Sequence, residues 1–257
     1  MSKDSLGDRM KDDYENRTRY ELPRRSYTLI RCDGKAFHSF TEGCKRPFDD
    51  RLIEAMNKTA VHLCSEITGT RLGYVQSDEI SILLTDFESP KTQAWFDGNL
   101  QKIVSISASL ATAAFNHYYK KDAEEFNPAL FDARAWTISI PVEVENYFIF
   151  RQQDAIRNSV NMVAQSLYSH RELLGVQIEE TLNLIQKKGQ NWNDYDLGKK
   201  NGRAIIRRSY QIPHPKTPQE QVTRHRWEVV EPPVFTEDRS FLRSLIPKLP
   251  EFSSGTD

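Results

Sequence analysis

The sequence predicts an α+β fold in which helices flank an antiparallel sheet of the ferredoxin-like (split βαβ) type and a C-terminal extension follows. Over residues 1–142, short β-rich runs alternate with helical spacing in the order strand, helix, strand, strand, helix, strand. This order is the split βαβ pattern. The rest of the chain changes from helical spacing to a basic loop and then to a proline-rich end, with no internal repeat.

The first half of the pattern consists of a strand and a helix. The β-rich run Tyr27 to Cys32 predicts the strand, which should end at Asp33-Gly34 because this dipeptide favours a turn. A helix is predicted over residues 50–67, where apolar residues recur on one stripe. The stripe consists of Leu52, Met56, Ala60, Leu63, Cys64 and Ile67.

The second half begins with two strands that face each other. The runs "RLGYVQ" (71–76) and "ISILLTDF" (80–87) flank the acidic turn "SDE", so a hairpin is predicted. A second amphipathic helix follows over residues 99–119. The run "ARAWTISIPV" (133–142) is predicted to be the fourth strand.

This strand order brings two acids together. In a ferredoxin-like sheet the third strand lies antiparallel beside the first, so the end of strand one and the start of strand three meet at one edge. We therefore expect Asp33 and Asp78 to converge. The alternative interpretation is that both are exposed turn residues, because Asp is common in turns.

Converging carboxylates predict a bound cation. Two carboxylates repel each other unless positive charge lies between them. Mg²⁺ takes carboxylates, phosphates and water as ligands, and the backbone carbonyl of Gly34 would add one more. Two such ions roughly 4 Å apart would stabilise the attacking and leaving oxygens in phosphoryl or nucleotidyl transfer. The sequence thus contains a candidate two-metal site at Asp33 and Asp78.

Basic residues supply candidate contacts to phosphate. Lys35 follows Gly34 in a loop that could bring backbone N–H groups close to a ligand, although it lacks the Walker pattern and a plain loop is the alternative. His38 lies between Phe37 and Phe40, so contact with a nucleotide and packing at the core edge are both open. A solvated face is the alternative for the remaining basic residues. These are Lys45, Arg46, Lys199, Lys200, Arg203, Arg207 and Arg208.

The chain after residue 142 is less regular. Helices are predicted over residues 151–170 and 177–187, and a basic loop follows them. Frequent prolines predict an extended arm at the end. We therefore divide the chain into a core with an N-terminal lead-in (1–142), a helical and basic-loop part of the same domain (143–210), and a Pro-rich extended C-terminal arm (211–257).

Composition constrains the class of protein. The 257 residues suffice for one large domain, and Lys plus Arg count 35 against 36 for Asp plus Glu, so net charge gives no indication of nucleic-acid binding. Cys32, Cys44 and Cys64 lack CxxC spacing, which argues against a disulfide framework and a zinc site and predicts a cytoplasmic location. No run approaches the roughly 20 apolar residues needed to span a bilayer, so we expect no membrane partner.

Several motifs together resemble one family. The segments "RCDGKAFHSF", "RPFDD", "YVQSDEISI" and "FRQQD" resemble the tRNA(His) guanylyltransferase family, including its 3′-to-5′ polymerase-like members. The similarity covers roughly the first two thirds of the chain. It implies a palm-type catalytic core, two Mg²⁺ ions, ATP and GTP or other NTPs as substrates, and addition of nucleotides to the 5′ end of tRNA at its acceptor stem. It also implies a homotetramer.

The resemblance implies roles for individual residues. Asp33, Gly34 through its carbonyl, and Asp78 would hold the metal ions, and Glu79 would support catalysis as the adjacent acid. Arg46 stands where the family often has Lys, which keeps the charge but changes the geometry. Nucleotide binding is implied for Gly34, Lys35, Ala36, Phe37, His38, Arg46, Ser77, Lys199 and Lys200, and RNA binding is expected for Arg203, Arg207 and Arg208.

One departure from the family pattern narrows the expected activity. Guanylyltransferases of the eukaryotic type carry His-Ile-Asn-Asn after the "RQ.D" element, whereas this chain has Ile156, Arg157, Asn158 and Ser159. We therefore expect template-dependent 3′-to-5′ addition that repairs 5′-truncated tRNA. The alternatives are a tRNA(His) guanylyltransferase that adds a single G, a nucleotidyl cyclase that needs no RNA acceptor, and a non-catalytic RNA-binding module.

Overall fold

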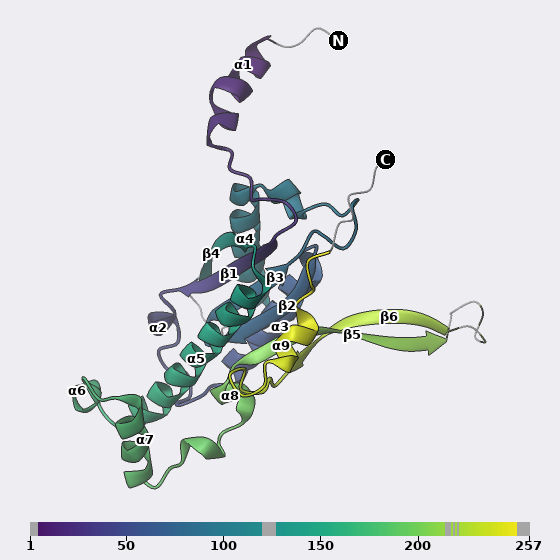
Figure 1. Ribbon diagram of the computed structural model, residues 1–257. Coiled ribbons are helices and arrows are strands. Elements are labelled where there is room, and N and C mark those ends of the chain that lie inside the picture. The colour runs from purple at the N-terminus through teal and green to yellow at the C-terminus, as the bar shows by residue number, and fades with distance from the viewer. Residues whose placement is uncertain (1–4, 120–126, 214–216, 218, 220, 251–257) are drawn as a thin grey trace.

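The computed structural model describes residues 5–119, 127–213, 217, 219 and 221–250 (Figure 1). Within them, six antiparallel strands form one sheet in the order β4-β1-β3-β2-β5-β6. The first four strands of this order are the split βαβ arrangement, so the predicted ferredoxin-like class is confirmed. The strands are β1 (Tyr27–Lys35), β2 (Thr70–Gln76), β3 (Glu79–Leu84), β4 (Leu130–Ile138), β5 (Arg203–Pro213) and β6 (Gln221–Val230).

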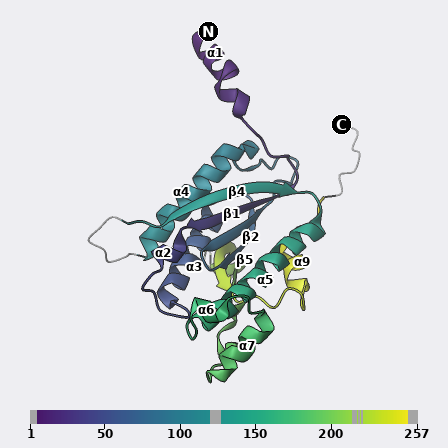
Figure 2. The same cartoon turned by 90° about the vertical axis from the view of Figure 1, so that its left-hand side faces the viewer.

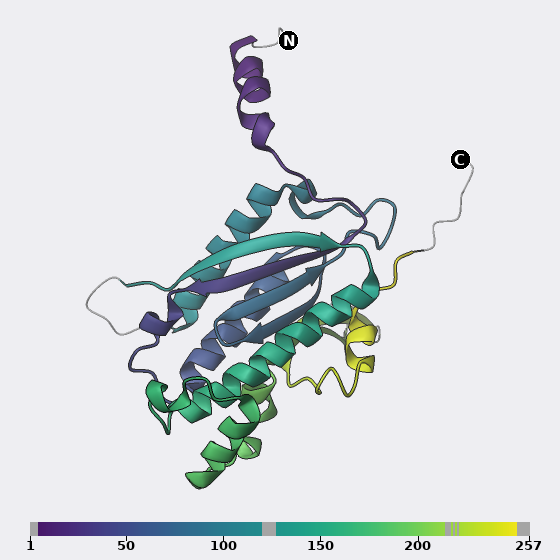
Figure 3. The ribbon, with the colours of Figure 1, turned by 60° about the vertical axis from the view of Figure 1, so that its left-hand side comes forward.

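Helices cover both faces of the central sheet. α3 (Asp50–Glu66) and α4 (Leu100–Tyr119) pack on one face, and α5 (Pro141–Gln165) runs along the other (Figures 2 and 3). Ile30 of β1 lies in the core under α3 and α4, whereas its neighbour Leu29 lies in the core under α5. Successive side chains of a strand point to opposite faces, so β1 serves both cores.

The sequence explains where the flanking helices begin. Asp49 caps α3, because its carboxylate accepts the N–H groups of Arg51 and Leu52 at 3.0 and 3.2 Å. Pro141 stands in the first turn of α5, where a missing N–H breaks no intrahelical hydrogen bond. The predicted boundaries are wrong here, since β4 ends at Ile138 and α5 begins about ten residues before the predicted helix.

The first strand also continues beyond its predicted end. Gly34 pairs with Phe131 and Lys35 with Leu130 of β4, so the Asp33-Gly34 dipeptide lies within β1. The neighbouring strand supplies backbone partners that outweigh the local turn preference of the dipeptide. As a result the backbone of Asp33 is held by the sheet.

The C-terminal part contains regular structure where the sequence predicts an extended arm over 211–257. β5 and β6 pair as far as Pro213 and Gln221 and project from the body as a long hairpin (Figure 1). The chain then returns to the body, where Phe235 and Leu242 are buried in the core under α5. Apolar side chains at these positions supply the burial that anchors the segment, which the prolines alone do not indicate.

Shorter helices complete the structure. α1 stands apart from the body and buries none of its residues (Figure 1). No described helix has the length and apolar character required to cross a bilayer. Part of the predicted arm (214–216, 218, 220 and 251–257) lies outside the described residues. The division of the chain at residues 142 and 210 stays a prediction. The shorter helices are α1 (Ser5–Asp13), η1 (Glu15–Thr18), α2 (Phe37–Phe40), η2 (Trp95–Gly98), α6 (His170–Leu173), α7 (Ile178–Lys187), η3 (Trp192–Asp194), α8 (Leu197–Lys200) and α9 (Ser240–Leu245).

Candidate active site

The end of β1 and the start of β3 lie side by side and carry three acids. Asp33 is the cross-strand partner of Glu79, and the N–H of Gly34 donates to the backbone carbonyl of Asp78 at 3.1 Å. Asp78 follows Ser77 in the tight turn between β2 and β3, and Ser77 has a φ of 47°. The convergence of Asp33 and Asp78 expected from the strand order is therefore present. We call these two residues the carboxylate edge.

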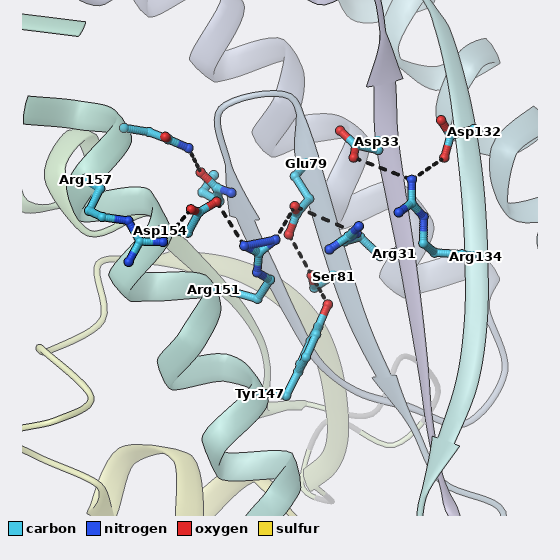
Figure 4. A network of polar contacts seen from close by, with 12 residues as sticks. Arg31, Asp33, Glu79, Ser81, Asp132, Arg134, Tyr147, Arg151, Asp154 and Arg157 are labelled. Atoms are coloured by element: carbon cyan, nitrogen blue, oxygen red, sulfur yellow. Dashed lines mark hydrogen bonds and ion pairs between the residues drawn. The ribbon is translucent and has the colours of Figure 1, made fainter. Parts of the chain in front are cut away.

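The electrostatics of the carboxylate edge favour a cation. Burial raises the pKa of Asp78 above its usual value, and the nearby charge of Asp33 raises it further. Arg134 of β4 lies 3.9 Å from the Asp33 carboxylate and is shared with Asp132 at 3.3 Å, so it neutralises Asp33 only weakly (Figure 4). Asp33 remains accessible, with 35% of its side chain exposed.

The residues present fit Mg²⁺. No group of three or more His, Cys, Asp or Glu side chains among the described residues is arranged to hold a metal ion. Mg²⁺ commonly binds through one or two carboxylates and completes its shell with phosphate oxygens and water. Asp33, Asp78 and the Gly34 carbonyl supply that partial set, which matches an ion that arrives with a nucleotide substrate.

Glu79 is committed to a buried ion pair. Its Oε2 accepts a hydrogen bond from Nη1 of Arg151 at 2.8 Å, and the two side chains are only 8% and 6% exposed (Figure 4). Its other oxygen accepts a hydrogen bond from the hydroxyl of Ser81 at 3.3 Å. Burial raises the pKa of Glu79, and Arg151 opposes this shift. The geometry places Glu79 in a supporting position beside the carboxylate edge.

Arg151 joins α5 to this part of the sheet. Its second nitrogen Nη2 contacts Asp154 at 2.9 Å, and Asp154 in turn contacts Arg157 at 2.8 Å (Figure 4). Tyr147, one turn earlier on α5, shares a hydrogen bond of 2.8 Å with the hydroxyl of Ser81. The sequence pattern does not reveal this network, although Arg and Asp spaced by three residues in "RQQD" indicate a pair on one helix face.

The segment after β1 is shaped by one aromatic ring. A Cβ at position 34 would lie 2.2 Å from the ring of Phe37, so only glycine fits there. Phe37 is buried against Phe40, Phe115 and Phe131, and it can reach a nucleotide only through its backbone. The chain turns into α2 at Ala36, where φ is 54°.

The exposed residues of the same segment are compatible with nucleotide binding. Lys35, Ala36 and His38 are exposed beside the carboxylate edge, so His38 is not packed in the core. Arg46 is exposed as well, and Ser77 is exposed at the turn before Asp78. Their predicted nucleotide contacts stay predictions.

Two of the predicted basic residues point inward. Lys200 is 8% exposed, and its Nζ donates to the backbone carbonyl of Asn193 at 2.8 Å. Arg203 is 6% exposed, and its Nε donates to Asn57 at 2.9 Å. Arg203 therefore offers little exposed surface for the RNA contact predicted for it, because its position at the start of β5 buries it beneath α3 and the preceding loop, and the contact stays a prediction. Lys200 likewise serves the fold through its packing under the helical part.

The other basic residues remain at the surface. Lys199 pairs with Asp50 at 2.7 Å and with Asp196 at 3.4 Å. Lys199 also lines a narrow pocket that Ser77 and Asn158 share, next to the turn that carries Asp78. Arg207 and Arg208 are exposed on the hairpin. These residues keep their predicted roles in nucleotide or RNA binding as proposals.

The fold and the carboxylate edge define a nucleotidyl-transfer enzyme, and comparisons with known proteins specify the family. The family model described as tRNAHis guanylyltransferase (Thg1) matches residues 7–139, more than half of the chain. The chain belongs to this family and is a nucleotidyltransferase.

Solved structures and a curated relative agree with this assignment. A bacterial Thg1-like protein in complex with ATP is 42% identical, with a TM-score of 0.84 over 95% of this chain and 99% of that chain. A structure of a bacterial Thg1-like protein in complex with GTP has a TM-score of 0.77 and 41% identity over the same shares. The tRNA(His) guanylyltransferase of Schizosaccharomyces pombe is 31% identical over 183 residues, which are 65% of this chain and 68% of that protein.

Proposed function

We propose that this protein is a template-dependent polymerase that adds nucleotides in the 3′-to-5′ direction to the 5′ end of tRNA. Its cellular task would be the repair of 5′-truncated tRNA. The convergence of Asp33 and Asp78 at one edge of the sheet carries the proposal. Two further observations support it, namely the ATP and GTP complexes of the similar bacterial proteins and the departure from His-Ile-Asn-Asn at Ile156–Ser159.

The reaction joins an incoming nucleotide to an activated 5′ end. The end carries a triphosphate, or its 5′-monophosphate is adenylylated by ATP with release of pyrophosphate, and the 3′-hydroxyl of an incoming NTP attacks its 5′ phosphorus. A phosphodiester bond forms, the bond to pyrophosphate or AMP breaks, and the hydroxyl proton is released. Asp33, Asp78 and the Gly34 carbonyl would hold two Mg²⁺ ions, and these would supply a lower pKa of the hydroxyl and neutralise charge on the phosphates.

The protein's own residues orient the substrates. Lys35, Arg46 and Lys199 would contact the triphosphate through charge-assisted hydrogen bonds. The backbone from Gly34 to His38 would wrap around it, since the ring of Phe37 is turned into the core. Base pairing with the opposite tRNA strand, and not a protein pocket, would choose the nucleotide.

The proposal also covers the partners. Arg207 and Arg208 on the hairpin would contact the phosphate backbone of the tRNA near its acceptor stem. A homotetramer is expected from the family resemblance, and a cytoplasmic location from the three cysteines, which are all free thiols in the structure.

A second candidate is a tRNA(His) guanylyltransferase that adds a single G. The name of the matching family and the Schizosaccharomyces pombe relative favour it. The two activities differ in whether addition depends on the base opposite the 5′ end. A guanylyltransferase of this kind would add G whatever that base is.

The test measures incorporation of labelled nucleotide onto a 5′-truncated tRNA with Mg²⁺ while the opposite base is varied. We expect template-matched addition by the wild type, and its loss in Asp33→Asn and in Asp78→Asn. Glu54→Gln is a matched control, because Glu54 is exposed on the surface of α3 and its ion pair among the described residues is with Lys58. Addition that survives both Asp substitutions would refute the role of the carboxylate edge. Addition of G opposite every base would select the second candidate.

A further inference from the structure

A pocket of about 370 Å³ lies at the root of the hairpin. Its walls are the end of α3 with the loop that follows and one face of the hairpin, and they include Ser65, Ile67, Thr70, Arg207, His225 and Trp227. β2 begins at Thr70 beside this pocket and ends at Gln76 beside the carboxylate edge. At about 3.3 Å per residue, the two ends are roughly 20 Å apart. The pocket is therefore separate from the site of nucleotidyl transfer.

Arg207, His225 and Trp227, on one face of the hairpin, form one wall of the pocket. Arg207 is the cross-strand partner of Trp227, and Ser209 is the partner of His225, so all four share a face. The hydroxyl of Ser209 lies 3.0 Å from Nδ1 of His225, which holds the imidazole ring on that side. Trp227 is half-buried and packs against the core under α3, so its indole has a fixed orientation.

The pocket combines an aromatic surface with cationic and polar groups. None of its lining residues is acidic, and no ion pair of Arg207 is found in the described part of the chain. Ile67 follows α3, and its carbonyl accepts the hydroxyl of Thr70 at 2.7 Å, so these two polar groups of the wall are paired with each other. The indole of Trp227 suits the face of a base, while the exposed Arg207 suits a phosphate.

We propose that this pocket binds one unpaired nucleotide of the RNA substrate, with the base against Trp227 and the phosphate at Arg207 and His225. The inference rests on the proposed function for the identity of the RNA. A polyanion is favoured over a free nucleotide because the opposite face of the same hairpin carries exposed Arg208, Arg224 and Arg226, so a longer RNA can contact basic residues on both faces. An aromatic surface together with basic residues along the strand is the usual arrangement for unpaired nucleotides.

The experiment compares the affinity of the whole protein for two RNAs by fluorescence anisotropy. One is tRNA, and the other is a blunt acceptor-stem duplex without unpaired nucleotides. We expect Trp227→Ala to weaken tRNA binding about 10-fold or more, the size of one lost base stack, and to leave duplex binding unchanged. Trp227→Phe should retain most of the affinity. Because Trp227 also packs against the core, Arg207→Ala provides a second variant that leaves that packing intact. It should also weaken the binding of tRNA more than the binding of the duplex.

Arg208→Ala is the matched control, since Arg208 is the neighbour of Arg207 on the opposite face and pairs with Glu228 at 3.1 Å. It should weaken both RNAs alike. If Trp227→Ala and Arg207→Ala lose affinity for both RNAs equally, the inference is overturned. Unchanged affinity for tRNA in these variants would also overturn it. Displacement of tRNA from the wild type but not from Arg207→Ala by micromolar GMP or ATP would overturn it in favour of a site for free nucleotides.

The nucleotide-addition assay separates this inference from the proposed function. If Trp227→Ala loses affinity for unpaired RNA but the wild type adds no nucleotide, the pocket stands and the polymerase activity fails. Template-matched addition by the wild type, with unchanged affinity in both pocket variants, would refute the pocket alone.

Discussion

The carboxylate edge and the hairpin are both rich in charge, but they hold it in opposite ways. Beside the edge, Glu79 and Arg151 are almost completely buried and contact each other at 2.8 Å. On the hairpin, the side chains of Arg208 and Arg226 are 59% and 67% exposed, and both pair with the single acid Glu228. Removal of one partner from a buried pair leaves an uncompensated charge, whereas an exposed pair contributes little.

This difference indicates two kinds of function. Buried partners hold β3 against α5, so the adjacent carboxylate edge keeps a defined geometry before substrate arrives. Exposed arginines on a projecting hairpin have few interactions to lose when a polyanion binds. The comparison predicts that changes near the edge affect stability and chemistry, while changes on the hairpin affect RNA affinity.

The largest expected effect is the loss of chemistry at the carboxylate edge. Asp33→Asn and Asp78→Asn should each lower the rate of nucleotide addition about 10³-fold, because several kcal/mol of charge stabilisation depend on the bound metal. Neither should lower the melting temperature, since each substitution removes repulsion between the two acids. Single-turnover kinetics and thermal unfolding provide the two measurements. A large fall in melting temperature with an unchanged rate of nucleotide addition would contradict this prediction, because the two acids would then serve the fold and not the chemistry.

Breaking the buried pair should have the next largest effect. Arg151→Met is expected to destabilise the fold by about 3 kcal/mol, because Glu79 is left buried with only the weaker contact to Arg31 at 3.9 Å. Arg157→Met is the control, since Arg157 is half exposed and contacts the same Asp154. Denaturant unfolding measures both variants. Adding Glu79→Leu to Arg151→Met should recover much of the lost stability, and failure to recover would show that the charge is not the cause.

The geometry of the carboxylate edge requires glycine at position 34. Gly34→Ala places a Cβ 2.2 Å from the ring of Phe37, and overpacking of this kind costs about 1–3 kcal/mol. The free energy of unfolding should fall by that amount, and nucleotide addition should fall with it because Asp33 is the preceding residue. Combining the substitution with Phe37→Leu should restore part of the stability. No restoration would mean that the clash with Phe37 is not responsible.

The pH dependence of stability should report on Asp78. Its pKa in the folded protein is raised above the usual 3.8, so its contribution to stability is present below that pH and is lost as pH rises through the raised value. The difference in unfolding free energy between wild type and Asp78→Asn, without metal, should therefore decline as pH increases from 4. A difference that grows with pH would contradict the sign. Added Mg²⁺ should stabilise the wild type at neutral pH and leave Asp78→Asn unaffected.

The smallest effect on stability is expected on the hairpin. Arg224→Ala should change the free energy of unfolding by less than about 0.5 kcal/mol, because the side chain is exposed. It should lower tRNA affinity and reduce the salt dependence of binding by about one released counterion. Titrations at several salt concentrations measure this slope. A slope equal to that of the wild type would exclude Arg224 from the RNA-binding surface.

The site could be predicted only where it depends on strand order. The order strand, helix, strand, strand, helix, strand was sufficient to place Asp33 and Asp78 at one edge, because backbone pairing leaves few alternatives for this pattern. The partner of Glu79 could not be predicted in this way. It depends on the rotation and position of α5, which are set by packing of side chains such as Phe148 against the sheet.

The basic residues show the same limit. Arg203, Arg207 and Arg208 look alike in the sequence, yet the first is buried under α3 and the other two lie on the projecting part of β5. Burial depends on how far along the strand the neighbouring helices extend. The local sequence around each arginine does not predict this extent. The sequence did not predict the hairpin, because the prolines in this part of the chain indicate an extended arm. In the structure, β5 and β6 pair with each other, and this pairing stabilises the hairpin.

Residue types, spacing and strand order thus establish the family, the sheet and the two acids of the carboxylate edge, since these follow from chemistry and backbone pairing along the chain. Packing of distant segments decides which charges are buried, which are exposed and where a second pocket opens. Pairs such as Glu79 and Arg151 are 72 residues apart in the chain. Their contact is determined by the shape of the whole core, because burial depends on every element that covers a side chain.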